Sequence, residues 1–205
     1  MHMFFRCAAI GALSLFLAAC TLSDRDRGAG PIRETSSGRV VGESGPEGSV
    51  VYRDIAYAQP PVGERRWMPP VAINTPEQTI TPLSEPVMCP QPQSMASGGA
   101  AGEYLGAEDC LYLDVYAPDP EGVSAPLPVM LWIHGGSNLT GHKGTYDFSR
   151  LAARQQVVVV VINYRLGPFG WFVHPALNGA TLSESPIANF ATLDMIEALH
   201  WTRRN

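Results

Sequence analysis

A loop of small residues after an apolar run is the part of this sequence best suited to chemistry. The run Leu127–His134 is mostly apolar, and Gly135, Gly136 and Ser137 follow it at once. Consecutive glycines let the backbone turn its N–H groups outward, because no Cβ stands in the way. Fixed donors of this kind stabilise an oxygen that becomes negatively charged during a reaction. An ordinary turn at the end of a strand is the alternative.

The first twenty residues are typical of an export signal. Arg6 supplies positive charge, Cys7–Leu17 is an unbroken run of small and apolar residues, and Ala18 and Ala19 precede Cys20. The run is too short to span a hydrocarbon core of about 30 Å, and small residues precede a cleavage point. The cysteine resembles that of a bacterial lipobox, which is diacylated and becomes the mature N-terminus.

We therefore expect a lipoprotein-type signal peptide over residues 1–19, lipid attachment at Cys20 and a flexible spacer over residues 20–30. The protein would then be exported from a bacterial cell. Its acyl chains would hold it to a membrane on the periplasmic or outer side. An ordinary signal peptide and a secreted protein are the alternative.

Export changes the meaning of the four cysteines. Cys7 would leave with the signal and Cys20 would take the lipid, so Cys89 and Cys110 remain as a pair in an oxidising compartment. A bridge between them would close a loop of about twenty residues and stabilise the fold by about 3 kcal/mol. The enclosed Pro90–Asp109 is rich in Gly, Ser and Ala, which favours a lid or binding loop pinned at its base. Two buried free thiols are the alternative.

Composition excludes several classes of function. The 205 residues carry a net charge of −5 without a run of Lys or Arg, which argues against binding to nucleic acid. The irregular cysteine spacing fits neither a dense disulfide scaffold nor a CxxC zinc site. We find no cluster of metal ligands and no phosphate-binding loop, and therefore expect no cofactor. The oligomeric state stays open.

The hydrophobic pattern predicts an α/β fold. Val157–Asn163 is almost purely β-branched, the pattern of a strand covered on both faces. Asn189 is placed to cap a helix that contains Asp194, which we interpret as a first-turn acid favoured by the helix dipole. The expected elements are an antiparallel edge with strands over Arg39–Val41 and Ser49–Tyr52, strands over Leu111–Tyr116, Leu127–His134 and Val157–Asn163, and helices over Asp147–Gln155 and Asn189–Arg204. So few strands would leave an uncovered edge, which suggests a fragment of something larger.

Five collinear segments resemble the type-B carboxylesterases, the α/β-hydrolase family that includes the cholinesterases. They are Ile55–Gly63, Glu108–Pro118, Trp132–Gly136, Asn163–Pro168 and Asn189–Asn205. The likeness covers residues 31–205. It implies an incomplete α/β-hydrolase fold, made of the N-terminal strands and first helices of a mixed sheet. It also implies hydrolysis of a small-molecule carboxylic ester by a serine nucleophile, through an acyl-enzyme.

The resemblance assigns roles to particular residues. Gly136 and Ser137 would donate backbone N–H groups to the oxyanion, and another donor would follow the nucleophile. Many relatives have glycine where Ser137 stands, and a serine there narrows the permitted backbone angles. Arg66 and Glu108 resemble positions that form a structural ion pair.

The nucleophile is the missing part. A serine esterase of this class needs a Gly-x-Ser-x-Gly elbow, and no serine of this sequence has glycine two positions before and two positions after it. Gly42–Gly45 is similar to the motif, but Pro46 follows it, so we interpret it as a turn. We expect the chain to end before the nucleophile and to be inactive alone. A non-catalytic, surface-tethered cholinesterase-like binding protein and a truncated gene product without function are the alternatives.

Overall fold

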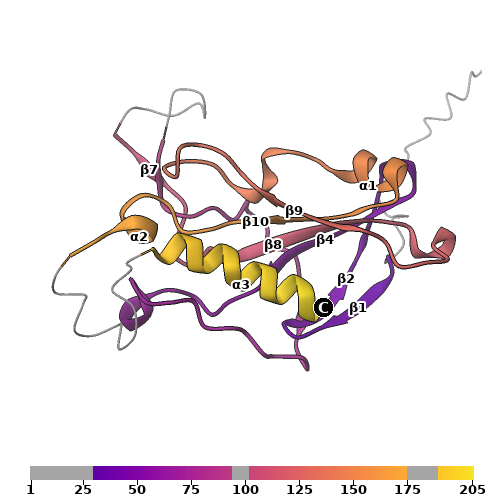
Figure 1. Cartoon of the computed structure of the whole chain (residues 1–205), viewed down its shortest axis with the longest axis horizontal. Coiled ribbons are helices and arrows are strands. Elements are labelled where there is room, and N and C mark those ends of the chain that lie inside the picture. The colour runs from indigo at the N-terminus through magenta and orange to yellow at the C-terminus, as the bar shows by residue number, and fades with distance from the viewer. Residues whose placement is uncertain (1–29, 94–101, 175–188) are drawn as a thin grey trace, which may run out of the picture.

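Five strands form the central sheet of this computed structural model, in the order β3–β4–β8–β10–β9 (Figure 1). The structure describes residues 30–93, 102–174 and 189–205. The strands of the central sheet are β3 (Glu43–Gly45), β4 (Ser49–Ala56), β8 (Tyr112–Pro118), β9 (Val129–Ile133) and β10 (Val158–Ile162). The helices are α1 (Ser149–Gln155), α2 (Gly167–Trp171) and α3 (Phe190–Arg204). The predicted signal peptide, residues 1–19, and the predicted lipid site at Cys20 lie outside the described residues.

Two smaller sheets flank the central one. The first has the order β1–β2–β5, and the second pairs β6 with β7. Their strands are β1 (Ile32–Thr35), β2 (Gly38–Val41), β5 (Thr79–Ile80), β6 (Gln91–Pro92) and β7 (Tyr104–Leu105). The pairs β1–β2 and β6–β7 are antiparallel. The two strands expected to form one antiparallel edge lie in different sheets instead: β2 pairs with β1 and β5, whereas β4 pairs with β3 and β8 in the central sheet.

Strand β10 holds the central sheet together. It pairs antiparallel with β8 and parallel with β9, and four of its five residues are buried. Parallel neighbours need a crossover connection, and α1 lies in the segment between β9 and β10. The β-branched run therefore forms the strand covered on both faces that its sequence predicts.

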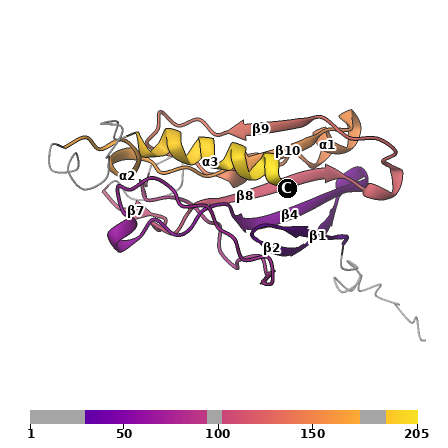
Figure 2. The ribbon, with the colours of Figure 1, turned by 60° about the horizontal axis from the view of Figure 1, so that its bottom comes forward.

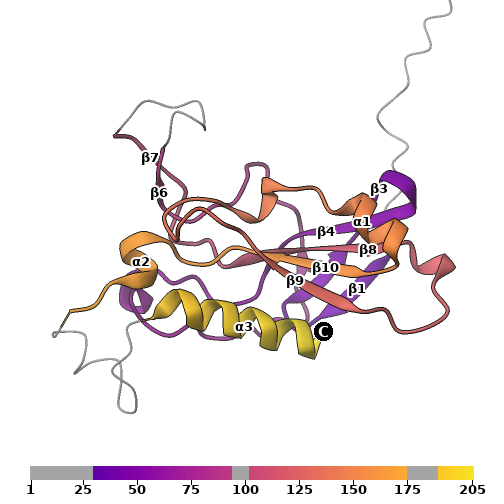
Figure 3. The same ribbon diagram turned by 45° about the horizontal axis from the view of Figure 1, so that its top comes forward.

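Alternate residues of β10 face the two layers of helices. Val159 and Val161 pack in a cluster with Ala152 of α1, whereas Val160 and Ile162 join the larger cluster that contains Ala198 of α3. This division follows from the two-residue period of a strand. Figure 3 shows α1 and α3 on opposite sides of the sheet. Burying each of these apolar side chains of β10 stabilises the fold by roughly 1.5–3 kcal/mol.

Strand β9 forms an open edge of the sheet. Within the described residues it pairs with β10 alone, and Figure 2 shows it on the outer side of the strands. Val129 and Met130 are 53% and 52% exposed, and Trp132 and Ile133 are also exposed. The predicted uncovered edge is therefore present at the strand that leads into the small-residue loop.

Two details of the sequence interpretation are wrong. Glu43–Gly45 forms strand β3, paired with β4, rather than a turn. Asp194 lies beyond the first turn of α3 and is fully buried, with both carboxylate oxygens bonded to the Arg165 side chain. A charge inside the protein needs a partner, and for Asp194 that partner is the Arg165 side chain rather than the helix dipole that we expected. Asn189 stands at the predicted N-cap position of α3, but its Oδ1 accepts from the Thr192 hydroxyl and not from a backbone N–H of the first turn.

No helix in the described ranges is long and apolar enough to cross a membrane.

Candidate active-site loop

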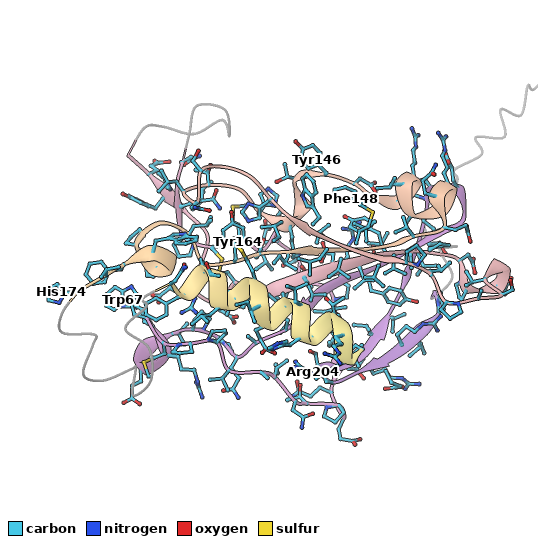
Figure 4. All side chains as sticks on the ribbon, in the orientation of Figure 1. Trp67, Tyr146, Phe148, Tyr164, His174 and Arg204 are labelled. Atoms are coloured by element: carbon cyan, nitrogen blue, oxygen red, sulfur yellow. A yellow bond between two sulfur atoms is a disulfide. The ribbon has the colours of Figure 1, made fainter. Side chains whose placement is uncertain are left out.

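The loop that follows β9 begins with a buried histidine. His134 is 4% exposed, and its ring stacks on Tyr164 with centroids 4.5 Å apart. The Tyr164 hydroxyl donates to the His134 carbonyl at 3.0 Å (Tyr164 is labelled in Figure 4). Burial lowers the pKa of His134 below its ordinary value, so the ring favours the neutral form. His134 therefore anchors the loop to the segment after β10.

Gly136 stands where the loop reverses. Its φ is +116°, and a Cβ at this position would lie 2.0 Å from the carbonyl oxygen of Thr140. The N–H groups of Leu139 and Thr140 donate to the Gly136 carbonyl at 3.0 and 3.1 Å. The close approach of these chain segments leaves no room for any residue with a side chain. Glycine is thus required here for both its space and its backbone angles.

Ser137 and Asn138 continue the left-handed backbone. Their φ values are +57° and +61°, in the region that favours glycine. Holding a residue with a side chain there costs on the order of 1 kcal/mol. The Asn138 carbonyl accepts from the Gly167 N–H at 2.7 Å, which joins this strained turn to the start of α2.

The backbone N–H groups of Gly136 and Ser137 are available. Both residues are exposed, and neither N–H has a hydrogen-bond acceptor among the described residues. Two adjacent free donors at the end of a strand suit the binding of a negatively charged oxygen. A hollow of about 440 Å³ lies beside them, between Ser137–Leu139 on one side and α2 with Phe172 and Val173 on the other.

The far end of the loop is held by an amide side chain. Gln91 Oε1 accepts from the Gly141 N–H at 2.8 Å, and Gln91 Nε2 donates to the Gly141 carbonyl at 3.0 Å. Gln91 Nε2 also lies 3.1 Å from the Cys89 carbonyl, to which it donates. Our sequence reasoning missed Gln91. The only local signal was a polar residue next to a predicted loop base, which does not single out one contact.

Cys89 and Cys110 form the predicted disulfide. Their sulfur atoms are 2.06 Å apart, and both residues are buried. The pairing of β6 with β7 closes the enclosed segment just beyond the bridge, with Gln91 opposite Leu105. The base of this segment and the far end of the small-residue loop therefore meet at Gln91.

A buried ionic cluster lies below the loop. Lys143 Nζ is 2.7 Å from Asp54 Oδ1 and 2.7 Å from Asp114 Oδ1, and Lys143 is 6% exposed. Asp54 sits at the irregularity between β4 and β8, with φ +55°. The Lys143 N–H donates to Asn163 Oδ1 at 2.7 Å. Every charge in this cluster has a partner, and its contacts join the residues after the loop to β4, β8 and the end of β10. Sequence reasoning did not find it.

Arg66 and Glu108 form a two-point ion pair. Arg66 Nε and Nη2 lie 2.6 and 2.5 Å from the two carboxylate oxygens of Glu108. The guanidinium also lies over the rings of Trp67 and Phe169, at 5.8 and 5.9 Å. The pair ties the segment after β4 to the residues just before Cys110, away from the free N–H groups. The Arg66–Glu108 contacts are those of the structural ion pair that the resemblance implies.

Exposed aromatic side chains flank the loop. Trp132 on β9 makes an edge contact with Tyr146 and a tilted contact with Phe148, at 5.8 and 5.4 Å between ring centroids. Tyr146 is 57% exposed, and Figure 4 shows it beside Phe148.

Among the residues with described positions, no group of three or more His, Cys, Asp or Glu side chains is arranged to hold a metal ion.

A mixed sheet between helices, with a glycine loop of free N–H groups after a strand, is the arrangement of part of an α/β-hydrolase. The model of the carboxylesterase family matches residues 29–205. The chain belongs to the carboxylesterase family.

Individual relatives agree. The chain is 39% identical to the para-nitrobenzyl esterase of Bacillus subtilis over 173 residues, which cover 83% of this chain and 34% of that protein. It is 37% identical to carboxylesterase 1D of Rattus norvegicus, over 93% of this chain and 35% of that one. It is 34% identical to the cocaine esterase of Homo sapiens, over 86% of this chain and 33% of that protein.

Solved structures give the same result. A thermophilic para-nitrobenzyl esterase superposes with a TM-score of 0.69 at 39% identity, over 85% of this chain and 35% of that chain. A carboxylesterase of Geobacillus stearothermophilus superposes with a TM-score of 0.67 at 35% identity, over 85% and 34%. The chain therefore spans about a third of the length of these relatives.

Proposed function

We propose that the protein to which these residues belong hydrolyses carboxylic esters through a serine nucleophile and an acyl-enzyme. In this proposal the N–H groups of Gly136 and Ser137 bind the oxyanion of the tetrahedral intermediate. The observation that carries it is the pair of exposed N–H groups without acceptors, in a turn where Gly136 has no room for a side chain. The printed names of the relatives, which are esterases, support the same reaction class.

The proposed chemistry follows from charge. When a serine oxygen attacks the ester carbon, the carbonyl oxygen becomes negative, and two fixed N–H donors stabilise it without reorganising. Loss of the alcohol leaves an acyl-enzyme, which water then hydrolyses. His134 is not the general base in this scheme, because its ring is buried against Tyr164 and its Nδ1 lies 2.9 Å from the Gly135 carbonyl.

We further propose that the 205 residues do not hydrolyse esters by themselves. The sequence has no Gly-x-Ser-x-Gly segment, so the free N–H groups have no activated serine beside them. The proposed contribution of this chain is the oxyanion loop, residues 135–141, and the disulfide-closed segment next to it.

The test compares two proteins, the 205-residue chain and the product of the longest open reading frame that contains it. Hydrolysis of a short-chain nitrophenyl ester is expected from the second and not from the first. In the longer protein, Ser137→Pro removes one donor and also cannot adopt the φ of +57° found here, so it should lower kcat by at least about 10²–10³-fold. Ser137→Gly keeps the N–H and suits φ +57°, so it should retain activity. An unchanged kcat in Ser137→Pro would refute the assignment of this donor.

A non-catalytic, surface-tethered binding protein is the second candidate, favoured by the missing elbow motif. It predicts that the longer reading frame also fails to hydrolyse esters. It further predicts cooperative thermal unfolding of the purified chain, whereas dye binding without a transition would count against it.

We also propose that the protein is exported from a bacterial cell and anchored to a membrane through acylated Cys20. The support is the sequence alone, with Arg6 before an apolar run and small residues before Cys20. Cys20→Ala should accumulate as unprocessed precursor, while Cys7→Ala should be processed normally. Normal processing and soluble release of Cys20→Ala would refute lipidation.

A further inference from the structure

Gln91 connects two parts of the molecule that are far apart in sequence. Its amide brackets Gly141, accepting from the N–H and donating to the carbonyl, at a separation of 50 residues. Gln91 is 7% exposed, so these part-buried hydrogen bonds are partly shielded from competing water. A paired donor and acceptor on one residue fixes both the position and the orientation of that peptide.

Gly141 in turn lies against the start of the oxyanion loop. Its φ is +113°, and a Cβ there would lie 2.4 Å from His134 Nδ1 and 2.5 Å from the Gly135 carbonyl. The loop therefore returns onto its own first residues at Gly141. The packing of Gly141 against Gly135 is the contact through which a displacement of Gly141 would reach the N–H of Gly136.

The other end of the connection is the disulfide. Gln91 Nε2 donates to the carbonyl of Cys89, two residues earlier in the chain. Cys89 is held by its bond to Cys110, and both are buried. The amide of Gln91 thus touches the disulfide-bonded backbone on one side and the oxyanion loop on the other.

We propose that Gln91 is a positioning residue that makes the geometry of the oxyanion loop depend on the Cys89–Cys110 disulfide. Its catalytic consequence rests on the proposed ester hydrolysis, whereas the structural coupling does not. The coupling predicts that a change at Gln91 or at the disulfide reaches the turn at Gly136.

Amide hydrogen exchange on the 205-residue chain tests the coupling. The reporters are the N–H groups of Leu139 and Thr140, which bond to the Gly136 carbonyl and not to Gln91. Gln91→Met keeps the length of the side chain and removes both hydrogen bonds to Gly141, so exchange at the reporters should accelerate about tenfold. Gln93→Met is the matched control, because Gln93 bonds to Glu103 through its backbone, and it should leave the reporters unchanged.

Reduction of the disulfide tests the other end of the connection, in the wild type and in Gln91→Met. A phosphine attacks one sulfur and breaks the S–S bond, and one water molecule then supplies the oxygen of the phosphine oxide and the two protons that the sulfurs take up. In the wild type, reduction should accelerate exchange at Leu139 and Thr140. In Gln91→Met it should add little, because the connection is already lost. Equal acceleration in both proteins, or none in the wild type, would overturn the proposal. If Gln91→Met does not fold, the wild-type arm decides, with the amides of α3 as the internal reference.

A kinetic measurement on the longer reading frame separates positioning from stability. Gln91→Met should lower kcat about tenfold and leave KM nearly unchanged, because the loop binds the oxyanion and not the ground-state ester. A rise in KM with kcat unchanged would contradict the positioning role. If the longer protein hydrolyses no ester at all, the proposed function fails, and the exchange experiments still judge the coupling.

Discussion

Arg165 and Asp194 form a buried two-point ion pair between the segment after β10 and helix α3. Arg165 Nε lies 2.8 Å from Asp194 Oδ2, and Arg165 Nη2 lies 2.7 Å from Asp194 Oδ1. Asp194 is fully buried, and Arg165 is 2% exposed. The pair fastens α3 to the sheet at Arg165, two residues before Gly167, whose N–H donates to the Asn138 carbonyl in the proposed oxyanion loop.

Breaking this pair from one side should be costly. Asp194→Ala leaves the Arg165 charge buried without its partner, so the free energy of unfolding should fall by about 3–5 kcal/mol. Urea denaturation of the purified chain measures this loss. The double variant Arg165→Met with Asp194→Leu replaces both charges by apolar groups and should be less destabilised than Asp194→Ala. A double variant as unstable as the sum of its single variants would contradict the pairing.

Gly135 and Gly136, adjacent in the proposed oxyanion loop, should respond differently to the same substitution. Gly136→Ala places a Cβ against the Thr140 carbonyl at φ +116°, and should lower the free energy of unfolding by about 1–3 kcal/mol. Gly135→Ala meets nothing within 4 Å, and should change it by less than about 0.5 kcal/mol. Thermal unfolding of both variants provides the comparison. Equal effects would mean that the turn at Gly136 is not as tight as described.

Removing the disulfide should destabilise the chain through the unfolded state. The bridged cysteines are 21 residues apart, which corresponds to about 3 kcal/mol of loop-closure entropy. Replacing Cys89 and Cys110 together by Ala should lower the free energy of unfolding by about this amount. Denaturation with and without a reducing agent checks it, since the agent should affect the wild type and leave the double variant unchanged.

Acid should weaken the fold through its buried imidazole. Burial lowers the pKa of His134 below the ordinary value of 6.5. As the pH falls through 6.5, the unfolded chain therefore binds a proton at this residue before the folded chain does. The free energy of unfolding should fall from about pH 7.5 until the pH reaches the folded pKa. His134→Asn should make this decline shallower, and His200→Asn, at an exposed position, is the control. An identical slope in His134→Asn and the wild type would exclude His134 as the cause.

Local patterns were sufficient for much of the architecture. The β-branched run at Val157–Asn163 predicts a covered strand, because side chains on both faces are apolar, and β10 is that strand. The helical spacing after Asn189 likewise predicts α3, and the glycines after β9 predict a loop. Each of these predictions depends only on residues close together in the sequence. The disulfide followed from counting the cysteines that export would leave available.

Tertiary structure alone decided which polar groups meet. Lys143 with Asp54, Gln91 with Gly141, and Arg165 with Asp194 are separated by 89, 50 and 29 residues. No periodicity encodes such a pair, because it depends on how several elements pack and on which buried charges then need partners. The left-handed backbone of Ser137 belongs to the same group, since serine seldom adopts φ +57° and the turn around it is closed by the hydrogen bonds from Leu139 and Thr140 to Gly136 and from Gly167 to Asn138. The sequence by itself determined the principal strands and helices (β4, β8, β9, β10, α1 and α3) and the family likeness, whereas the folded chain determined the contacts that hold the proposed oxyanion loop in place.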